Sequence, residues 1–102
     1  MPLVRLCSKS DLPAEGHATE ISISGQTICV ANVKGQISAM DNVCAHRGGP
    51  LGQGVIEGDK VVCPWHGWSY DPRTGAASHD SRARVPVYAV KIMGDDVMLD
   101  IE

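Results

Sequence analysis

The chain has 102 residues, of which 43% are hydrophobic and 21% are charged, and its formal net charge is −3. This length suffices for one packed core, so we expect a single domain over residues 1–102, and it favours a carrier, a binding module or a subunit over a self-sufficient enzyme. Because the charge is slightly negative and no run of Lys or Arg occurs, nucleic acid is excluded as a partner.

The first half of the sequence indicates a β-meander. One short helical turn is expected over residues 10–15, with Ser10 or Asp11 as its cap and Pro13 inside it. The strands that follow are marked by alternation, by β-branched apolar residues and by a Lys34-Gly35 turn between the last two. They are expected over residues 20–24, 27–33 and 36–40.

The second half of the sequence also indicates strands joined by turns. We expect strands over residues 60–63, 85–93 and 97–101, of which the last two form a hairpin around the tight Gly94-Asp95-Asp96 turn. Residues 76–84 are polar enough to form a mobile surface loop. Because helix is a minor component, we expect an all-β protein, built as an antiparallel β-sandwich or a small barrel.

The N-terminal segment shows no sign of export, since it lacks the apolar stretch of a secretory signal and the paired arginines of a twin-arginine leader. No stretch approaches about 18 uninterrupted apolar residues, the length that a membrane-spanning helix needs. We therefore expect a cytoplasmic protein that does not bind a membrane. In this reducing compartment, cysteines are thiols or metal ligands rather than a disulfide framework, and we expect structural roles for Cys7 and Cys29.

Two short Cys/His pairs stand out, Cys44-Ala45-His46 and Cys63-Pro64-Trp65-His66, and residues 47–62 separate them. A pair spaced by one or two residues can reach one metal centre from a single tight turn. The glycines that follow each pair let backbone N–H groups approach the sulfur atoms closely. A single cysteine is usually a small buried apolar residue, but this pairing favours a metal site.

A tetrahedral zinc site with two cysteines and two histidines is the alternative interpretation of the same residues. In its commonest form, both cysteines lie on one knuckle and both histidines on a helix. Here each segment supplies one cysteine and one histidine, and no helix is expected after the second pair. A structural zinc-binding module is therefore kept as a remote alternative.

The segments CAHRGGPL, at residues 44–51, and CPWHGWSYD, at residues 63–71, resemble the two cluster-binding loops of Rieske proteins. Every ligand of the family pattern and the spacing between the pairs match, and the strand pattern extends the resemblance over most of the chain. The resemblance implies a Rieske-type antiparallel β-sandwich or small barrel that holds one [2Fe-2S] cluster. It implies one buried iron and one iron nearer solvent, bound respectively by the cysteines Cys44 and Cys63 and by the histidines His46 and His66.

The resemblance also implies roles for residues around the cluster. Tyr70 matches a family tyrosine that donates a hydrogen bond to a ligand cysteine, and core packing is the alternative role. Trp65 and Trp68 are expected to shield the cluster, with core filling as an overlapping role. Arg47 is expected either to pair with an acidic group or a partner near the cluster, or to be a solvated surface residue. Pro86 is expected in a third loop that covers the site.

Three functional classes compete for a small Rieske protein. The first is a free ferredoxin, which carries single electrons from a flavin-containing ferredoxin reductase to the terminal oxygenase of a dioxygenase system. The second is the small subunit of an assimilatory nitrite reductase, bound to the nitrite reductase large subunit. The third is an oxygenase subunit, which needs a mononuclear iron held by two histidines and a carboxylate in a further domain. Since only His17 and His79 are spare and no further domain is expected, the oxygenase subunit is set aside. Between the other two classes we favour the carrier, an electron-transfer component rather than an enzyme, and keep the nitrite reductase small subunit as the alternative.

The family resemblance also bounds the reduction potential. In respiratory cytochrome bc complexes, a further cysteine in each loop forms a disulfide, and a serine donates a hydrogen bond to a bridging sulfide. Gly49, Trp65 and Trp68 stand at the corresponding positions of this sequence. Each missing hydrogen bond leaves more electron density on sulfur and lowers the potential, so we expect roughly −150 mV, in the lower part of the Rieske range.

Overall fold

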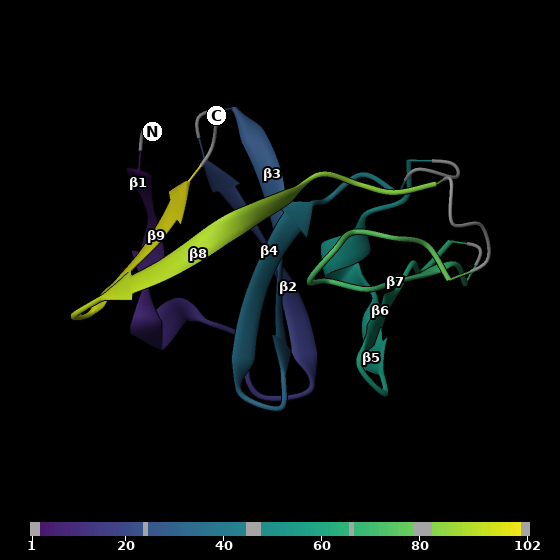
Figure 1. Cartoon of the computed structure of the whole chain (residues 1–102), viewed down its shortest axis with the longest axis horizontal. Helices are drawn as coiled ribbons and strands as arrows, with labels where there is room; N and C mark the ends of the chain where they lie inside the picture. Colours follow the sequence, from purple (N-terminus) through teal and green to yellow (C-terminus); the bar gives the residue numbers. More distant parts are fainter. Residues whose placement is uncertain (1–2, 24, 45–47, 66, 79–82, 101–102) are drawn as a thin grey trace.

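The structure of the chain, a computed structural model, is built almost wholly from antiparallel strands (Figure 1). It describes residues 3–23, 25–44, 48–65, 67–78 and 83–100. Within these ranges nine strands occur and no α-helix, which confirms the expected all-β class. In the same ranges no helix is long and apolar enough to cross a membrane.

Six strands form one curled antiparallel sheet in the order β1-β9-β8-β4-β3-β2. Their bounds are β1 Leu3–Ser8, β2 His17–Ile23, β3 Gln26–Val33, β4 Gln36–Asp41, β8 Val87–Met93 and β9 Asp96–Asp100. The two end strands, β1 and β2, also contact each other, so the sheet curls towards a small barrel (Figure 1). The predicted turn between β3 and β4 is present, and Lys34 and Gly35 have φ of 54° and 86°, as a tight hairpin requires.

A second, three-stranded sheet is inserted between β4 and β8 and lies beside the larger one (Figure 1). It consists of β5 Val55–Glu57, β6 Lys60–Val62 and β7 Ser69–Tyr70, in the order β5-β6-β7. The first Cys/His pair lies between β4 and a short 3₁₀ turn, η2 Leu51–Gln53, and the second pair lies between β6 and β7. The insertion therefore carries both segments that the sequence marks for metal binding.

The alternating side chains of β3 contribute to two separate hydrophobic cores. Ile28 and Val30 pack into the core of the curled sheet, whereas Cys29 and Ala31 pack into a second core. Successive residues of a strand point to opposite faces, which is why one continuous buried run serves both cores. The second core also contains Cys44, Cys63, Leu51, Val61 and Tyr70. The metal-binding segments are thereby packed directly against the outer face of β3.

The predicted helical turn lies earlier in the chain than expected. In this part of the chain the structure has the 3₁₀ turn η1 Lys9–Asp11, and Pro13 lies after it. The backbone N–H of Ser8 donates to the carboxylate of Asp11 at 3.2 Å, and this cap fixes where the turn begins. Leu12 already has extended backbone, so the prediction of a turn over residues 10–15 is wrong in position.

The polar segment at residues 76–84 is not simply a surface loop at its described ends. Ala77 is buried in the second core and bridges to Tyr70, and Ala76 bridges to Arg84. Residues 79–82 lie outside the described residues.

The sequence also underestimated the number of strands: β1, β5 and β7 were not predicted, and β5 and β7 are too short to show a period of their own.

Candidate metal centre

Cys44 and Cys63 begin two turns that share one backbone hydrogen-bond pattern. The carbonyl of Cys44 accepts from the N–H of Gly48 at 2.8 Å, and the carbonyl of Cys63 accepts from the N–H of Gly67 at 3.0 Å. The N–H of each cysteine donates to the carbonyl five residues ahead, at 2.9 Å and 2.7 Å respectively. Gly48 and Gly67 have φ of 78° and 76°, a backbone region that glycine adopts without strain. The two turns therefore present their cysteines in the same way.

The two turns meet at Gly49. A Cβ atom at this position would lie 2.6 Å from Sγ of Cys63 and 3.0 Å from Cγ of Trp65. Such approaches leave no room for a side chain, so only glycine lets the backbone of the first turn pack against the second. Gly49 and Trp65 stand where the resemblance places the two disulfide cysteines of the respiratory proteins. In this chain, close packing between these residues joins the turns there.

Tyr70 directs its hydroxyl at the first cysteine. The hydroxyl oxygen lies 3.0 Å from Sγ of Cys44, and Tyr70 is fully buried in β7. β7 pairs with β6 through Tyr70 and Val61, which holds the tyrosine at a fixed depth. A cysteine bound to metal is a thiolate and can only accept a hydrogen bond, so the tyrosine is then the donor.

The cysteine side of the site is deeply buried. Cys44 and Cys63 are 3% and 2% exposed and share one core. His46, His66 and Arg47 lie outside the described residues. In the described part of the chain, no group of three or more His, Cys, Asp and Glu side chains is placed to hold a metal ion, at this site or elsewhere. Two buried sulfurs, glycine-rich turns and a hydroxyl beside one sulfur suit an iron–sulfur cluster, so the residues present fit that group.

The aromatic residues expected around the site have different surroundings. Trp68 is partly buried against the core that contains both cysteines. Trp65 is 57% exposed, so its ring covers Gly49 on one side and faces solvent on the other. Val43, beside the first cysteine, is also 54% exposed. The described residues next to the turns thus form an apolar, accessible surface over a buried sulfur pair.

The segment around Pro86 contacts the site through its neighbour. Val85 is buried in the core with the cysteines, and its N–H donates to the carbonyl of Gly75 at 2.9 Å. Pro86 itself is exposed, and its carbonyl accepts from the N–H of Asp41 at 2.9 Å. This segment thus packs beside the cysteines through Val85, and the covering role expected of the loop with Pro86 stays a prediction.

Cys29 lies in the same core as Cys44 and Cys63. Burial, with the negative charge of Glu20 as a second cause, raises the pKa of the Cys29 thiol to about 12. It is therefore a neutral, inert thiol at physiological pH. The sequence-based expectation of a structural role agrees with this environment.

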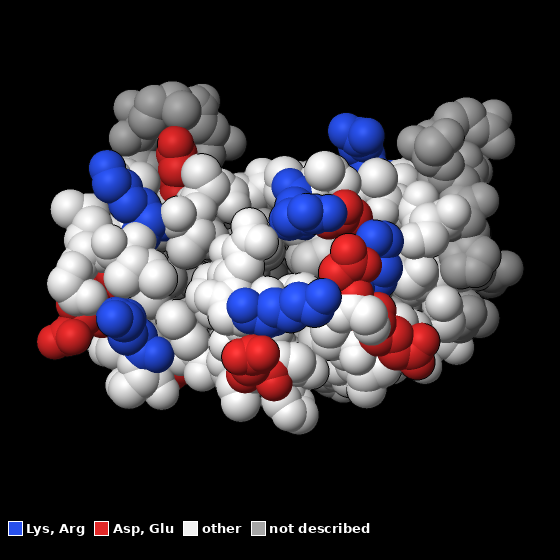
Figure 2. All heavy atoms as spheres, turned by 60° about the horizontal axis from the view of Figure 1, so that its bottom comes forward, with Lys and Arg blue, Asp and Glu red and all other residues white. Residues whose placement is uncertain are grey.

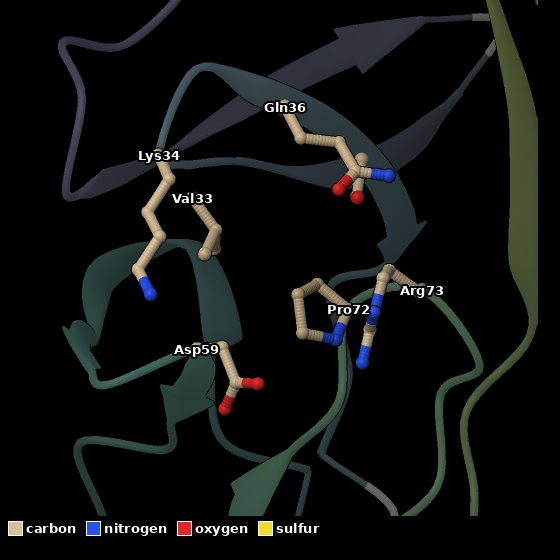
Figure 3. A pocket seen from close by; sticks show the side chains of 7 residues that line it. Val33, Lys34, Gln36, Asp59, Pro72 and Arg73 are labelled. Carbon is tan, nitrogen blue, oxygen red and sulfur yellow. The ribbon is translucent and has the colours of Figure 1, made fainter.

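A hollow of about 230 Å³ lies between the β3–β4 turn, the β5–β6 turn and the turn after β7 (Figure 3). Lys34, Asp59 and Arg73 surround it with charges of both signs. The ion pair with Lys60 lowers the pKa of Asp59, chiefly through a hydrogen bond. Figure 2 shows acidic and basic side chains intermingled over the face that lies at the bottom of Figure 1. The residues that line this hollow include neither cysteine nor histidine, so it is distinct from the metal centre.

Sequence reasoning missed the polar residue that precedes the first cysteine. Asn42 is buried, although it lies between the end of β4 and Cys44 and carries a carboxamide. A carboxamide residue directly after strand β4 was the available signal. Its partners, Glu20 and Gly52, come from segments distant in the sequence, and no local pattern predicts them.

Comparisons with known proteins agree with this geometry. The family model of the Rieske [2Fe-2S] domain matches residues 3–96 of the sequence. The chain is 36% identical over 104 residues to the ferredoxin component of biphenyl 2,3-dioxygenase from Rhodococcus jostii, covering 100% of this chain and 95% of that protein. It is 33% identical over 88 residues to the ferredoxin component of a naphthalene 1,2-dioxygenase system from Pseudomonas aeruginosa, covering 85% of each. A solved ferredoxin structure from Sphingomonas yanoikuyae has a TM-score of 0.87 and 29% identity, covering 99% of this chain and 100% of that one.

Proposed function

Because this chain belongs to the Rieske [2Fe-2S] domain family, we propose that it binds its cluster through Cys44, His46, Cys63 and His66 and carries single electrons between protein partners. The bound cluster supplies one-electron chemistry at a potential set by its ligands and by hydrogen bonds to its sulfurs. Relatives that match over at least 85% of both chains, from biphenyl and naphthalene dioxygenase systems, are ferredoxin components, which are electron carriers rather than enzymes.

The matching turns at Cys44 and Cys63 carry this proposal. They share one hydrogen-bond pattern, they meet where Gly49 packs on Sγ of Cys63, and both cysteines are buried. A ligand histidine follows each cysteine by two or three residues in the sequence. This arrangement supports an iron shared by the cysteines on the core side and an iron bound by the histidines on the outer side.

The chain's own side chains have three tasks in electron transfer. The Tyr70 hydroxyl donates to the thiolate of Cys44 and stabilises the negative charge that grows on reduction. Packing between Gly49 and Trp65 holds the two turns together. The core that contains Val61 and Leu51 excludes water and partners from the cysteine side. The electron therefore enters and leaves through the outer face.

The partners follow from the relatives. We propose a flavin-containing ferredoxin reductase as the electron donor and the terminal oxygenase of a dioxygenase system as the acceptor. The similarity to ferredoxin components of biphenyl and naphthalene dioxygenase systems supports this choice over a nitrite reductase large subunit. The single domain over residues 1–102 and the cytoplasmic location belong to the same proposal.

Anaerobic purification of the whole chain tests the cluster. We expect a brown protein with two irons and two acid-labile sulfides per chain, and a rhombic electron paramagnetic resonance signal after reduction. A colourless protein with one zinc per chain, prepared with adequate iron and sulfide, would overturn the proposal.

Histidine substitutions test the ligand set. His46→Ala and His66→Ala should each abolish the rhombic signal, because an alanine cannot bind iron. His17→Ala is the matched control, since His17 lies in β2 and is exposed. An unchanged signal in either ligand variant would contradict the assignment.

A further inference from the structure

The first cluster-binding loop is closed at its base by Asn42. The backbone carbonyl of Asn42 accepts from the N–H of Leu51 at 2.8 Å, and its side-chain Oδ1 accepts from the N–H of Gly52 at 2.6 Å. Between these two ends, Val43 bridges to Pro50. Asn42, two positions before Cys44, thus accepts hydrogen bonds from two consecutive backbone amides at the far end of the loop, those of Leu51 and Gly52.

Glu20 of β2 completes the closure. The Nδ2 group of Asn42 donates to Oε2 of Glu20 at 2.6 Å, and Nε2 of Gln53 donates to Oε1 of Glu20 at 3.1 Å. The carboxylate therefore accepts one hydrogen bond from the residue before the loop and one from the 3₁₀ turn after it. Hydrogen bonds to an ionised acceptor are shorter and stronger than neutral ones.

The base of the loop also fits tightly against these two side chains. A Cβ atom on Gly52 would lie 2.5 Å from Cγ of Glu20 and 2.8 Å from Oδ1 of Asn42. No side chain fits there, so the backbone of η2 rests directly on the Glu20–Asn42 pair. The loop that begins at Cys44 is thereby attached to both β2 and β4 of the larger sheet.

We propose that Glu20 and Asn42 are positioning residues for the cluster, which hold the first loop so that Cys44 keeps its contact with Tyr70 while the electron arrives and leaves. This inference rests on the proposed function, because it requires Cys44 to be a cluster ligand. The hydrogen bonds of the pair reach the backbone of Leu51 and Gly52 and the side chain of Gln53, so the pair acts through the loop. Loosening it should alter the surroundings of the cluster sulfurs as well as the stability of the fold.

Two substitutions that exchange the amide and the carboxylate of this pair test the role. Asn42→Asp replaces the donating Nδ2 by an oxygen that faces the carboxylate of Glu20, and two like charges at hydrogen-bond distance repel. We expect release of the cluster to an iron chelator to become at least about tenfold faster, with a shifted and broadened resonance signal. Adding Glu20→Gln again places an amide opposite a carboxylate, with the amide now at position 20 and the carboxylate at position 42. The double variant should return to within about threefold of the wild-type release rate.

Asn32→Ala is the matched control for stability. Asn32 closes the β3–β4 turn with the same kind of bonds: its Nδ2 donates to the carbonyl of Pro13, and its Oδ1 accepts from the N–H of Gly35, both at 2.9 Å. This variant should melt at a lower temperature, yet keep the wild-type signal, potential and release rate.

Each outcome bears on the proposal. The proposal is overturned if Asn42→Asp has the same resonance signal and cluster release rate as Asn32→Ala. It is also overturned if the double variant does not restore the wild-type release rate. If Asn42→Asp alone does not fold, the yield of cluster-loaded double variant gives the same answer. A wild-type chain without a cluster would instead contradict the proposed function itself.

Discussion

The hydroxyl of Tyr70 lies 3.0 Å from Sγ of Cys44, and both side chains are buried. Reduction increases the negative charge on the cluster sulfurs, so a donated hydrogen bond stabilises the reduced state more than the oxidised state. Tyr70→Phe should therefore lower the reduction potential. A difference of about 1 kcal/mol between the two states corresponds to about 40 mV for a one-electron couple, measurable by protein-film voltammetry.

Tyr88→Phe is the control for that measurement. The Tyr88 hydroxyl accepts from Nε2 of Gln26 at 2.8 Å, and its ring packs against the core of the curled sheet. Removing this hydroxyl deletes a tyrosine hydrogen bond of similar length that lies in the other core. Equal potentials for both variants and the wild type would show that the Tyr70 hydroxyl does not act on the cluster.

The wild-type potential should lie in the lower part of the Rieske range, at roughly −150 mV. Gly49 and Trp65 pack against each other where the respiratory proteins place a disulfide, and Trp68 replaces their serine. The chain therefore lacks two features that raise the potential in those proteins. Voltammetry at neutral pH measures the value directly, and a potential above about +100 mV would contradict this account of the cluster's surroundings.

Gly49→Ala should reduce cluster incorporation strongly. The added methyl group would lie 2.6 Å from Sγ of Cys63, and a sulfur bound to iron has no freedom to move away. Overpacking in a closed site costs about 1–3 kcal/mol, which corresponds to roughly 5- to 160-fold less of the assembled form. The ratio of iron and sulfide to protein after reconstitution checks this prediction.

Gly16→Ala is the control that distinguishes crowding by the added methyl group from the general effect of replacing a glycine. Gly16 has a φ of +83°, so alanine is strained there, but among the described residues no atom beyond the two chain neighbours lies within 4 Å of the added Cβ. This control should lower the melting temperature and leave the iron content unchanged. Full iron content in Gly49→Ala would mean that the two turns can separate without losing the cluster.

The sequence predicted the long strands because their side chains alternate or are β-branched over five or more residues, as in β2, β3 and β8. It did not predict β5 and β7, which are three and two residues long and exist through their pairing with β6. The helical turn was misplaced because the bond from the Ser8 N–H to Asp11, rather than helix propensity, decides where it begins.

The two cysteines proposed as ligands could be recognised because their spacing to the histidines is local in the sequence. The closure by Glu20 and Asn42 was not, since the two residues are 22 positions apart and meet only when β2 packs beside the first loop. The exposure of Trp65 was not predictable either, because a tryptophan beside a cysteine is as consistent with burial as with a surface contact.

The apolar surface beside the turns should be the docking face for redox partners. Val43 and Trp65 are 54% and 57% exposed and flank the turns of the two cysteines, whereas the opposite side of the sulfurs is filled by the core. Arg47, expected from the sequence to meet a partner here, lies outside the described residues. Electron transfer falls steeply with distance, so a partner must approach from this face.

Val43→Asp should therefore lower kcat/KM for reduction by the cognate reductase about tenfold or more, because a buried unpaired charge at an interface is costly. The absorption and resonance spectra should stay unchanged, since Val43 points away from the core. Ile92→Asp is the matched control: Ile92 is 45% exposed on β8, outside the core that holds the cysteines.

Arg47→Glu should change the rate of reduction most at low salt, where surface charges are least screened. Equal rates for Val43→Asp and Ile92→Asp, together with a salt-independent Arg47→Glu, would place the docking face elsewhere on the molecule.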